Sequence, residues 1–303
     1  MTQSLLKQQI KQQASRREIL QRSDLIPPLP SLVTTLLGVL NTSDAETGQL
    51  EALLQNDPVL VARMLAMVNS PFYGMNRRIR TIKEAIIVLG ARGIRSLVLA
   101  AGSTKFLEQD FHWYGHEPKG LWLHSVGVAA GARSIARHCK LTSDQCELTF
   151  VGGLLHDIGK LSLVGYLQAA PVVTTEDAML AYERQVVGLD HAEVGSLVTA
   201  RWNLASEIQS IIEQHHSEVS RECDASGTDV RTVECVPGAC VRLADCVAHE
   251  IGFGYLPNRA PVQAVAVADL DLVGLDEARW ISVRCQAIDA MKAAVVAFEG
   301  LSD

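Results

Sequence analysis

Helix start signals constrain the fold of this chain more than any other feature of its sequence. Asn56-Asp57-Pro58 ends one helix and starts another, because Asp57 can accept first-turn amides and Pro58 stands where its missing amide donor costs nothing. Apolar residues then recur at helical spacing from Leu60 to Val68. A capping-box pattern, in which the threonine caps and the glutamate reaches back, opens another apolar run at Thr81-Ile82-Lys83-Glu84. Since no segment alternates convincingly with a period of two, we predict an all-α fold.

Composition excludes several classes of protein. With 303 residues, of which 48% are hydrophobic and 20% charged, the chain can bury a full core and is unlike a disordered protein. The formal net charge of −7 argues against broad binding to a phosphate backbone, so we expect no nucleic-acid partner. We find neither a signal-peptide pattern nor an apolar run of about 18 residues, so we expect a cytoplasmic protein without a membrane partner. The seven cysteines include no Cys-x-x-Cys pair and are expected to be reduced thiols.

Histidine and aspartate residues stand in or at the edges of the predicted helices. If these helices pack around one cleft, imidazole nitrogens and carboxylate oxygens would hold one or two divalent ions, with iron or manganese favoured over zinc. One aspartate, at position 157, would then bridge two ions. The residues concerned are His124, His156, Asp157, His191, His215, His216 and Asp245.

The same set of residue types suits hydrolysis of a phosphoester. A bound metal ion lowers the pKa of its water ligand to about 7, which supplies a nucleophile at neutral pH. Lys160 lies close to one helical turn after Asp157 and would offer its ammonium group to a phosphate. Asp157 and Lys160 are therefore the catalytic candidates, and Gly159 between them allows the backbone to come close.

A structural interpretation competes with this one. Histidine and aspartate residues are more often capped, hydrogen-bonded or exposed than bound to a metal. Asp190 is better explained as a helix cap than as a ligand, and Asp245 could equally face solvent. We assign no role to the remaining histidines, which are His112, His116, His138 and His249.

Several separated motifs resemble the HDOD domain, the HD-related output domain of bacterial signalling proteins. The earlier motifs are Ile26-Pro27-Pro28-Leu29-Pro30, Asn56-Asp57-Pro58, Val68-Asn69-Ser70-Pro71-Phe72-Tyr73-Gly74 and Ala85-Ile86-Ile87-Val88-Leu89-Gly90. The later motifs are Gly153-Leu154-Leu155-His156-Asp157-Ile158-Gly159-Lys160, His191-Ala192-Glu193-Val194-Gly195 with Trp202, and His215-His216. The resemblance covers about residues 25 to 250 and implies an all-helical fold with a role in bacterial signal transduction.

Composition and the resemblance together predict how the chain is organised. A polar helical arm at 1–24 precedes an amino-terminal helical half at 25–120, which packs on an HD-like metal-binding bundle at 121–250, and a helical extension occupies 251–303. HDOD domains are related to HD-domain phosphohydrolases and to the HD-GYP phosphodiesterases, which cleave cyclic dinucleotides. By that resemblance the seven residues above fall on metal-holding positions, and Lys160 falls on a lysine near the scissile phosphate.

The chain departs from these enzymes in three places. No Gly-Tyr-Pro motif follows His215-His216, so the loop typical of cyclic-dinucleotide phosphodiesterases is missing. Gly120 stands where members with three metal ions carry a glutamate, so we do not expect a third ion. Ala205 replaces a proline that the family tends to have at the start of a helix.

Two functions follow as competing expectations. The first is a signalling protein that acts through contact with a protein partner and keeps an HD-type metal site. The second is a metal-dependent phosphohydrolase or phosphodiesterase that acts on a nucleotide or cyclic dinucleotide. A basic cluster is expected to be a solvated helix face, or else a docking surface for an acidic partner or a ligand phosphate. Its members are Arg77, Arg78, Arg80, Lys83, Arg92 and Arg95.

Overall fold

The computed structural model confirms the all-α prediction. It describes residues 29, 31–40, 47–54, 57–70, 73–167, 175–217, 235–257, 260 and 264–299, and within these ranges every regular element is a helix. The only pairing of extended residues among them is an isolated bridge between His116 and Tyr255. The polar arm expected at 1–24, and the proline-rich segment apart from Leu29, lie outside the described residues.

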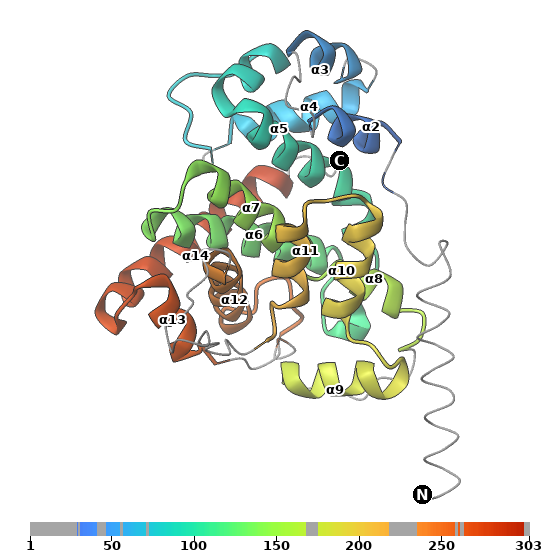
Figure 1. Cartoon of the computed structure of the whole chain (residues 1–303), viewed down its shortest axis with the longest axis vertical. Coiled ribbons are helices and arrows are strands. Elements are labelled where there is room, and N and C mark those ends of the chain that lie inside the picture. The colour runs from blue at the N-terminus through green and yellow to red at the C-terminus, as the bar shows by residue number, and fades with distance from the viewer. Residues whose placement is uncertain are drawn as a thin grey trace, which may run out of the picture.

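The amino-terminal helices form one layer, at the top of Figure 1. These helices are α2 (Ser31–Leu40), α3 (Thr47–Leu54), α4 (Pro58–Val68) and α5 (Ile82–Leu107). As expected, Asp57 accepts a hydrogen bond from the amide of Leu60 at 2.9 Å, and α4 begins at the proline that follows Asp57. The expected capping box at the start of α5 is only half right. Thr81 accepts from the amide of Glu84 at 3.1 Å, but Glu84 accepts from the amide of Arg80, one residue earlier than predicted, at 2.8 Å.

Helix α5 runs through the core of this layer. Its segment Ile82–Thr104 is the one candidate in the described residues that is long and apolar enough to cross a membrane by length and composition, but 56% of its apolar window is buried inside the protein. The helix packs against α2, α3, α4 and α7 (Ser143–Leu155), and Gly90 interrupts it with φ of 68°. These contacts are those of a core helix.

The remaining helices form a bundle around α6 (Gly120–His138), which packs on α7 (Ser143–Leu155), α12 (Cys235–Glu250) and α14 (Glu277–Glu299). Three short elements and three further helices complete the bundle. The short elements are the 3-10 turn η2 (His112–Tyr114), α8 (Lys160–Leu163) and α13 (Val267–Val273), and the helices are α9 (Glu176–Val186), α10 (His191–Arg201) and α11 (Ser206–Glu213). In Figure 1, α9 lies across the lower end of α10 and α11. Helix α14 also contacts α4, so the carboxy-terminal residues join both parts of the fold.

A buried arginine connects the amino-terminal layer to the bundle. Arg133 on α6 is 1% exposed, and its guanidinium carbon lies 4.7 Å from the ring centre of Tyr73 and 5.0 Å from that of Phe150. The same guanidinium donates to Glu147 at 3.2 Å, and Glu147 accepts from the hydroxyl of Ser96 on α5 at 2.6 Å. The positions of the domain boundaries remain a prediction.

Cysteine chemistry agrees with the composition argument. The cysteines whose side chains the structure describes are free thiols, namely Cys139, Cys146, Cys240, Cys246 and Cys285.

Candidate metal centre

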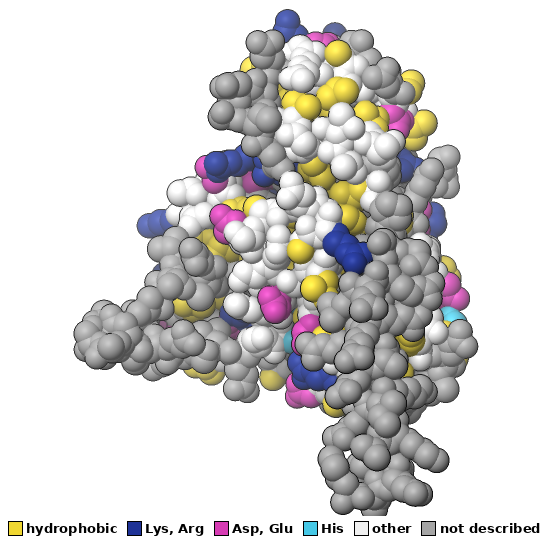
Figure 2. All heavy atoms as spheres, turned by 45° about the vertical axis from the view of Figure 1, so that its right-hand side comes forward, with side chains coloured by type: hydrophobic (Ala, Val, Ile, Leu, Met, Phe, Trp, Pro, Cys, Tyr) yellow, Lys and Arg dark blue, Asp and Glu magenta, His cyan; other side chains and the backbone are white. Residues whose placement is uncertain are grey.

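The fold brings all seven candidate ligands to one place. Five elements supply them: α6 gives His124, the end of α7 gives His156 and Asp157, α10 starts with His191, the turn after α11 gives His215 and His216, and α12 gives Asp245. Apart from His216, whose side chain is 8% exposed, each residue is at most 1% exposed. Little of the histidine colour reaches the face drawn in Figure 2.

Asp157 lies between two groups of these residues. Its Oδ2 atom is 3.4 Å from His156 Nε2 and 3.7 Å from His124 Nε2, whereas its Oδ1 atom is 3.2 Å from His191 Nε2 and 4.0 Å from His215 Nε2. Ligand atoms of Asp157, His191, His215 and His216 all lie within 4.8 Å of one another, as do those of His124, His156 and Asp157. Each carboxylate oxygen of Asp157 therefore faces a different group.

Asp245 belongs to the first of these groups. Its Oδ1 atom is 3.1 Å from His124 Nε2 and 3.6 Å from His156 Nε2. The residue is 1% exposed, so the alternative in which Asp245 faces solvent is wrong.

In three of the imidazoles, a hydrogen bond made by the Nδ1 atom fixes where the Nε2 lone pair points. The Nδ1 atoms of His156 and His215 donate to the backbone carbonyls of Gly153 at 2.8 Å and Ile212 at 2.5 Å. The Nδ1 atom of His191 donates to Glu183 at 2.8 Å. A carbonyl or carboxylate partner at Nδ1 requires the proton there, so Nε2 is left to bind a metal ion or a second proton.

The Nε2 atoms of the site lie close to one another, and there are too few hydrogen-bond donors among them. The Nε2 atoms of His191 and His216 are 2.9 Å apart, and those of His124 and His156 are 3.3 Å apart. Both oxygens of Asp245 and the Nε2 atom of His215 are buried without a hydrogen-bond partner among the described residues. Buried polar atoms rarely stay unpaired, and a cation between these atoms would satisfy them. The donor set therefore fits divalent metal ions.

Charge in the site leads to the same conclusion. Four carboxylates, on Asp157, Glu176, Glu183 and Asp245, are at most 5% exposed and face one buried ammonium group, that of Lys160. Burial alone would raise the pKa of Asp157, but the imidazole of His156 and the ammonium of Lys160 hold it well below its usual range. Such an excess of buried acidic groups is balanced by metal ions or by protons, either on the imidazoles or on Glu176, whose pKa burial raises.

The imidazoles around Asp157 Oδ1 differ in how readily they take a proton. Burial opposes a charge on His191, but the Glu183 carboxylate beside it more than compensates and raises the pKa of His191 to about 10. Burial likewise lowers the pKa of His215 and His216 well below the usual value, and neighbouring imidazoles add to this effect. The neutral imidazoles of His215 and His216 are the form that binds a metal ion.

Lys160 pairs with Asp157 inside the site. Its Nζ atom lies 2.7 Å from Asp157 Oδ2, and it stands 5.1 Å from the ring centre of Tyr114. The side chain is 3% exposed, so the ammonium group points into the site. Gly159 allows this geometry, because a Cβ atom there would lie 2.0 Å from the carbonyl oxygen of His191. The close backbone approach expected at this glycine is confirmed.

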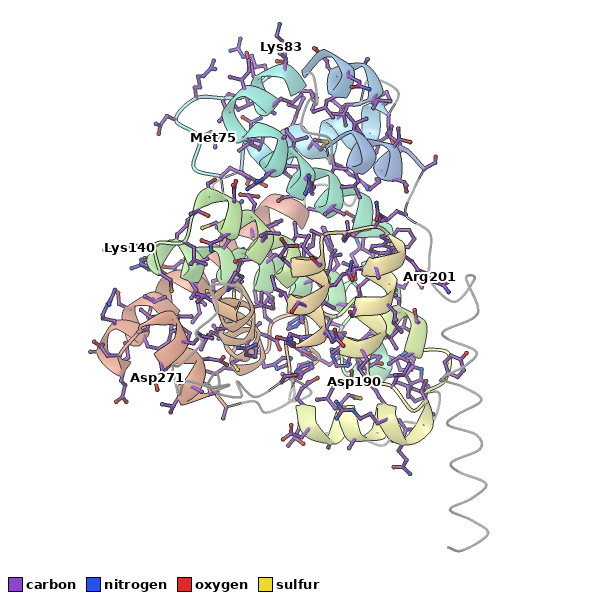
Figure 3. The ribbon with its side chains drawn as sticks, in the orientation of Figure 1. Met75, Lys83, Lys140, Asp190, Arg201 and Asp271 are labelled. Atoms are coloured by element: carbon purple, nitrogen blue, oxygen red, sulfur yellow. The ribbon has the colours of Figure 1, made fainter. Side chains whose placement is uncertain are left out.

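The competing structural interpretation holds for two other polar residues. Asp190 caps α10 by accepting from the amide of Glu193 at 2.8 Å, and Glu193 accepts from the amide of Asp190 at 3.0 Å. Figure 3 shows Asp190 at the start of α10, above α9. His112 is half exposed and pairs with Asp110 at 3.0 Å.

Several site residues were not found from the sequence. Glu176 and Glu183 come from α9, and Tyr114 donates to Glu183 at 2.8 Å. His249, to which we assigned no role, lies 3.6 Å from Asp245 Oδ1 and forms a third candidate ligand group with Asp245 and His124. Its spacing of four residues from Asp245 places both on one helix face, and this signal could have identified it.

The glycine in place of a family glutamate has a local explanation. A Cβ atom on Gly120 would lie 2.0 Å from the carbonyl oxygen of Gly254, and Gly254 itself has φ of +81°. The loop at 252–255 thus fills the space that a longer side chain would need, and its Tyr255 hydroxyl lies 2.9 Å from His249 Nε2.

The basic cluster lies on α5 and on the segment before it. Arg77, Arg78, Arg80 and Lys83 are exposed on the amino-terminal layer, where Figure 3 labels Lys83 at its upper edge. Arg92 forms an ion pair with Asp144. Both interpretations of this cluster, a solvated face and a docking surface, stay open.

Comparisons with known proteins identify the family. Residues 26–218 match the HDOD domain. The chain belongs to the HDOD family. An uncharacterised protein of Treponema pallidum (strain Nichols) is 30% identical to this HDOD chain over 210 residues, which are 66% of this chain and 39% of that protein. Ribonuclease Y of Pseudothermotoga lettingae is 28% identical over 179 residues, which are 58% of this chain and 29% of the enzyme.

A solved structure shares the fold over nearly its whole length. An HDOD domain protein of unknown function from Geobacter sulfurreducens superposes with a TM-score of 0.66 at 24% identity, covering 96% of this chain and 98% of the other. The HDOD chain spans less than half the length of the two curated relatives above. The rest of each relative lies outside the aligned region.

Proposed function

We propose that this HDOD chain is a bacterial signal-transduction protein that acts through contact with a protein partner and holds two divalent cations, iron or manganese, in its bundle. The observation that carries the proposal is the convergence of imidazole Nε2 atoms on the two oxygens of Asp157, in a site with excess buried negative charge. The proposed ligands are His124, His156 and Asp245 with Asp157 Oδ2 for one ion, and His191, His215 and His216 with Asp157 Oδ1 for the other.

Enclosure of the site favours a signalling role over catalysis. A phosphodiester substrate must reach the metal ions and the lysine, yet the proposed ligands are almost completely buried and Lys160 already pairs with Asp157. Acidic residues of α9 close the side next to His191 and His216. A closed metal site suits a structural or sensory ion, which needs no substrate access.

One observation favours the enzymatic alternative, a phosphohydrolase acting on a nucleotide or cyclic dinucleotide. The residues for two ions are all present, and Lys160 stands beside the carboxylate that would bridge them. Bound metal ions would supply an activated water and neutralise phosphate charge. Lys160 would then leave Asp157 to bind a phosphoryl oxygen, and His191 would stay oriented by Glu183.

Metal analysis followed by an activity assay separates the two functions. Protein purified without added metal should contain about one to two equivalents of iron or manganese, and less than about 0.2 equivalents of any transition metal would contradict the metal site. Incubation with Mn²⁺ and bis-nitrophenyl phosphate or cyclic dinucleotides should give no turnover if the site is sensory.

The variant Lys160→Ala makes the activity assay specific for this site. Turnover that Lys160→Ala abolishes while metal content stays at the wild-type level would establish the enzyme and contradict the signalling proposal. Turnover and metal content that fall together would instead remove the phosphate-binding role of Lys160.

A further inference from the structure

Glu176, the first residue of α9, points at one of the two proposed metal positions. It is 5% exposed, and its Oε1 atom lies 3.3 Å from His216 Nε2 and 3.9 Å from His191 Nε2. The two imidazole atoms are themselves 2.9 Å apart. Two ligands of one ion with bonds of about 2.1 Å lie about 3 Å apart at right angles and about 4.2 Å apart on opposite sides. All three separations therefore fit one coordination shell, with Glu176 and His216 as neighbours and His191 at a wider angle to Glu176.

The Oε1 atom of Glu176 has no hydrogen-bond partner among the described residues. A buried carboxylate oxygen without a partner is costly, and the buried ammonium group of Lys160 donates to Asp157 and not to Glu176. The backbone amides at the start of α9 do not pair with this oxygen either. The side chain that caps this helix end is Thr175, which accepts from the amide of Ala178 at 3.3 Å. A metal ion would supply the missing partner.

Glu183, the second acid of α9, has all its partners within the protein. It accepts from the backbone amide and the Nδ1 atom of His191, each at 2.8 Å, and from the hydroxyl of Tyr114 at 2.8 Å. Helix α9 is therefore attached to α10 near the carboxy-terminal end of α9 without a metal ion, whereas its first residue lacks such an attachment. The two acids of one helix differ in this respect although both are buried.

We propose that Glu176 is a further protein ligand of the cation held by Asp157 Oδ1, His191, His215 and His216, so that metal binding fixes the amino-terminal end of α9. This inference rests on the metal centre of the proposed function and adds a ligand that the resemblance did not supply. A second carboxylate among three imidazoles makes this position harder, which favours Mn²⁺ or Fe²⁺ over softer ions.

Mn²⁺ titration of metal-stripped protein tests the assignment. Wild-type protein, Glu176→Gln and Asp177→Asn are compared by isothermal calorimetry; Asp177 is the matched control, since it is the next residue on α9 and is exposed. We expect Glu176→Gln to weaken one of two Mn²⁺ equivalents at least tenfold and to leave the other unchanged, with Asp177→Asn like wild type. Equal affinities in all three proteins would overturn the assignment.

Hydrogen exchange of α9 gives a second measurement, and its first part uses the wild-type chain alone. Mn²⁺ should slow exchange of the amides in the first turns of α9, and Glu176→Gln should remove this slowing. Bound Mn²⁺ with unchanged exchange at α9 would contradict the inference while leaving the proposed metal centre intact. Wild-type protein that binds no Mn²⁺ at all would refute the metal centre and, with it, the role of Glu176.

Discussion

The Oδ1 atom of Asp157 lies 3.2 Å from the Nε2 atom of His191, although 34 positions separate the two residues in the sequence. The other oxygen of the same carboxylate faces His156 at 3.4 Å. One side chain thus joins the end of α7 to the start of α10 and serves both proposed ions. Loss of its charge should affect both.

Asp157→Asn is expected to reduce binding of both metal ions. The amide keeps the shape of the side chain but removes the negative charge that two cations share, so both Mn²⁺ equivalents should weaken at least tenfold. Calorimetry on metal-stripped protein measures this, with circular dichroism as the check on folding. Loss of only one equivalent would show that Asp157 does not bridge.

Asp190→Ala is expected to change stability without changing metal content. Asp190 caps α10 and pairs with Arg184, while its neighbour His191 carries the ligand atom. Loss of an N-cap costs about 1 kcal/mol, in a range of roughly 0.5–2 kcal/mol, of the free energy of unfolding. Urea unfolding and elemental analysis of the same sample give the two readouts. A metal content that drops by an equivalent would mean that Asp190 is more than a cap.

Gly159→Ala is expected to disturb the contact between α8 and α10. The new Cβ atom would lie 2.0 Å from the His191 carbonyl oxygen and 2.7 Å from the Gly195 amide nitrogen, so the backbone must move. Overpacking of this kind costs about 1–3 kcal/mol, and displacement of His191 should also weaken Mn²⁺ binding.

Gly165→Ala is the control for this substitution. A Cβ atom there has nothing within 4 Å, so the Mn²⁺ affinity of this variant should match that of wild type, and its stability should be equal or higher by up to about 1 kcal/mol. If the two alanine variants behave alike, the close approach of residue 159 to α10 is not needed for the site.

Tyr73 is expected to make the fold sensitive to alkaline pH. Burial raises the pKa of Tyr73 to about 12, although the neighbouring guanidinium of Arg133 lowers it. The unfolded chain ionises its tyrosine near pH 10, so the stability from this residue is complete below pH 10 and is lost as the pH rises from about 10 to about 12. By linkage, this loss amounts to about 2–3 kcal/mol.

Comparison with Tyr73→Phe isolates this effect, because phenylalanine cannot ionise. The free energy of unfolding of wild type should fall more steeply than that of the variant between about pH 9 and pH 11.5. Parallel curves would show that the phenol ionises equally well in the folded and unfolded chain.

Local signals predicted the helix starts well. The caps at Asp57 and Asp190 depend on a few neighbouring residues, and both form the expected hydrogen bonds. The predicted hydrogen bond from the amide of Thr81 to Glu84 is wrong by one residue, since Glu84 accepts from the amide of Arg80. A flexible side chain can accept from either of two adjacent amides. The all-α class followed from many such signals together.

The site itself was only partly predictable. The seven candidate ligands follow from motif spacing, and His249 could have been added from its position four residues after Asp245. Glu176 and Glu183 could not, since they stand in an ordinary amphipathic helix and reach the site only because α9 lies beside the start of α10 and the turn after α11. Tertiary packing of this kind leaves no periodic trace in the sequence.

Anomalous diffraction from crystals grown with Mn²⁺ tests the metal centre most directly. The account predicts two peaks, one within about 2.5 Å of each carboxylate oxygen of Asp157, with the second peak also contacted by Glu176. Data collected at the manganese edge that place no ion beside Asp157, in crystals whose protein fold matches the one described, would contradict it.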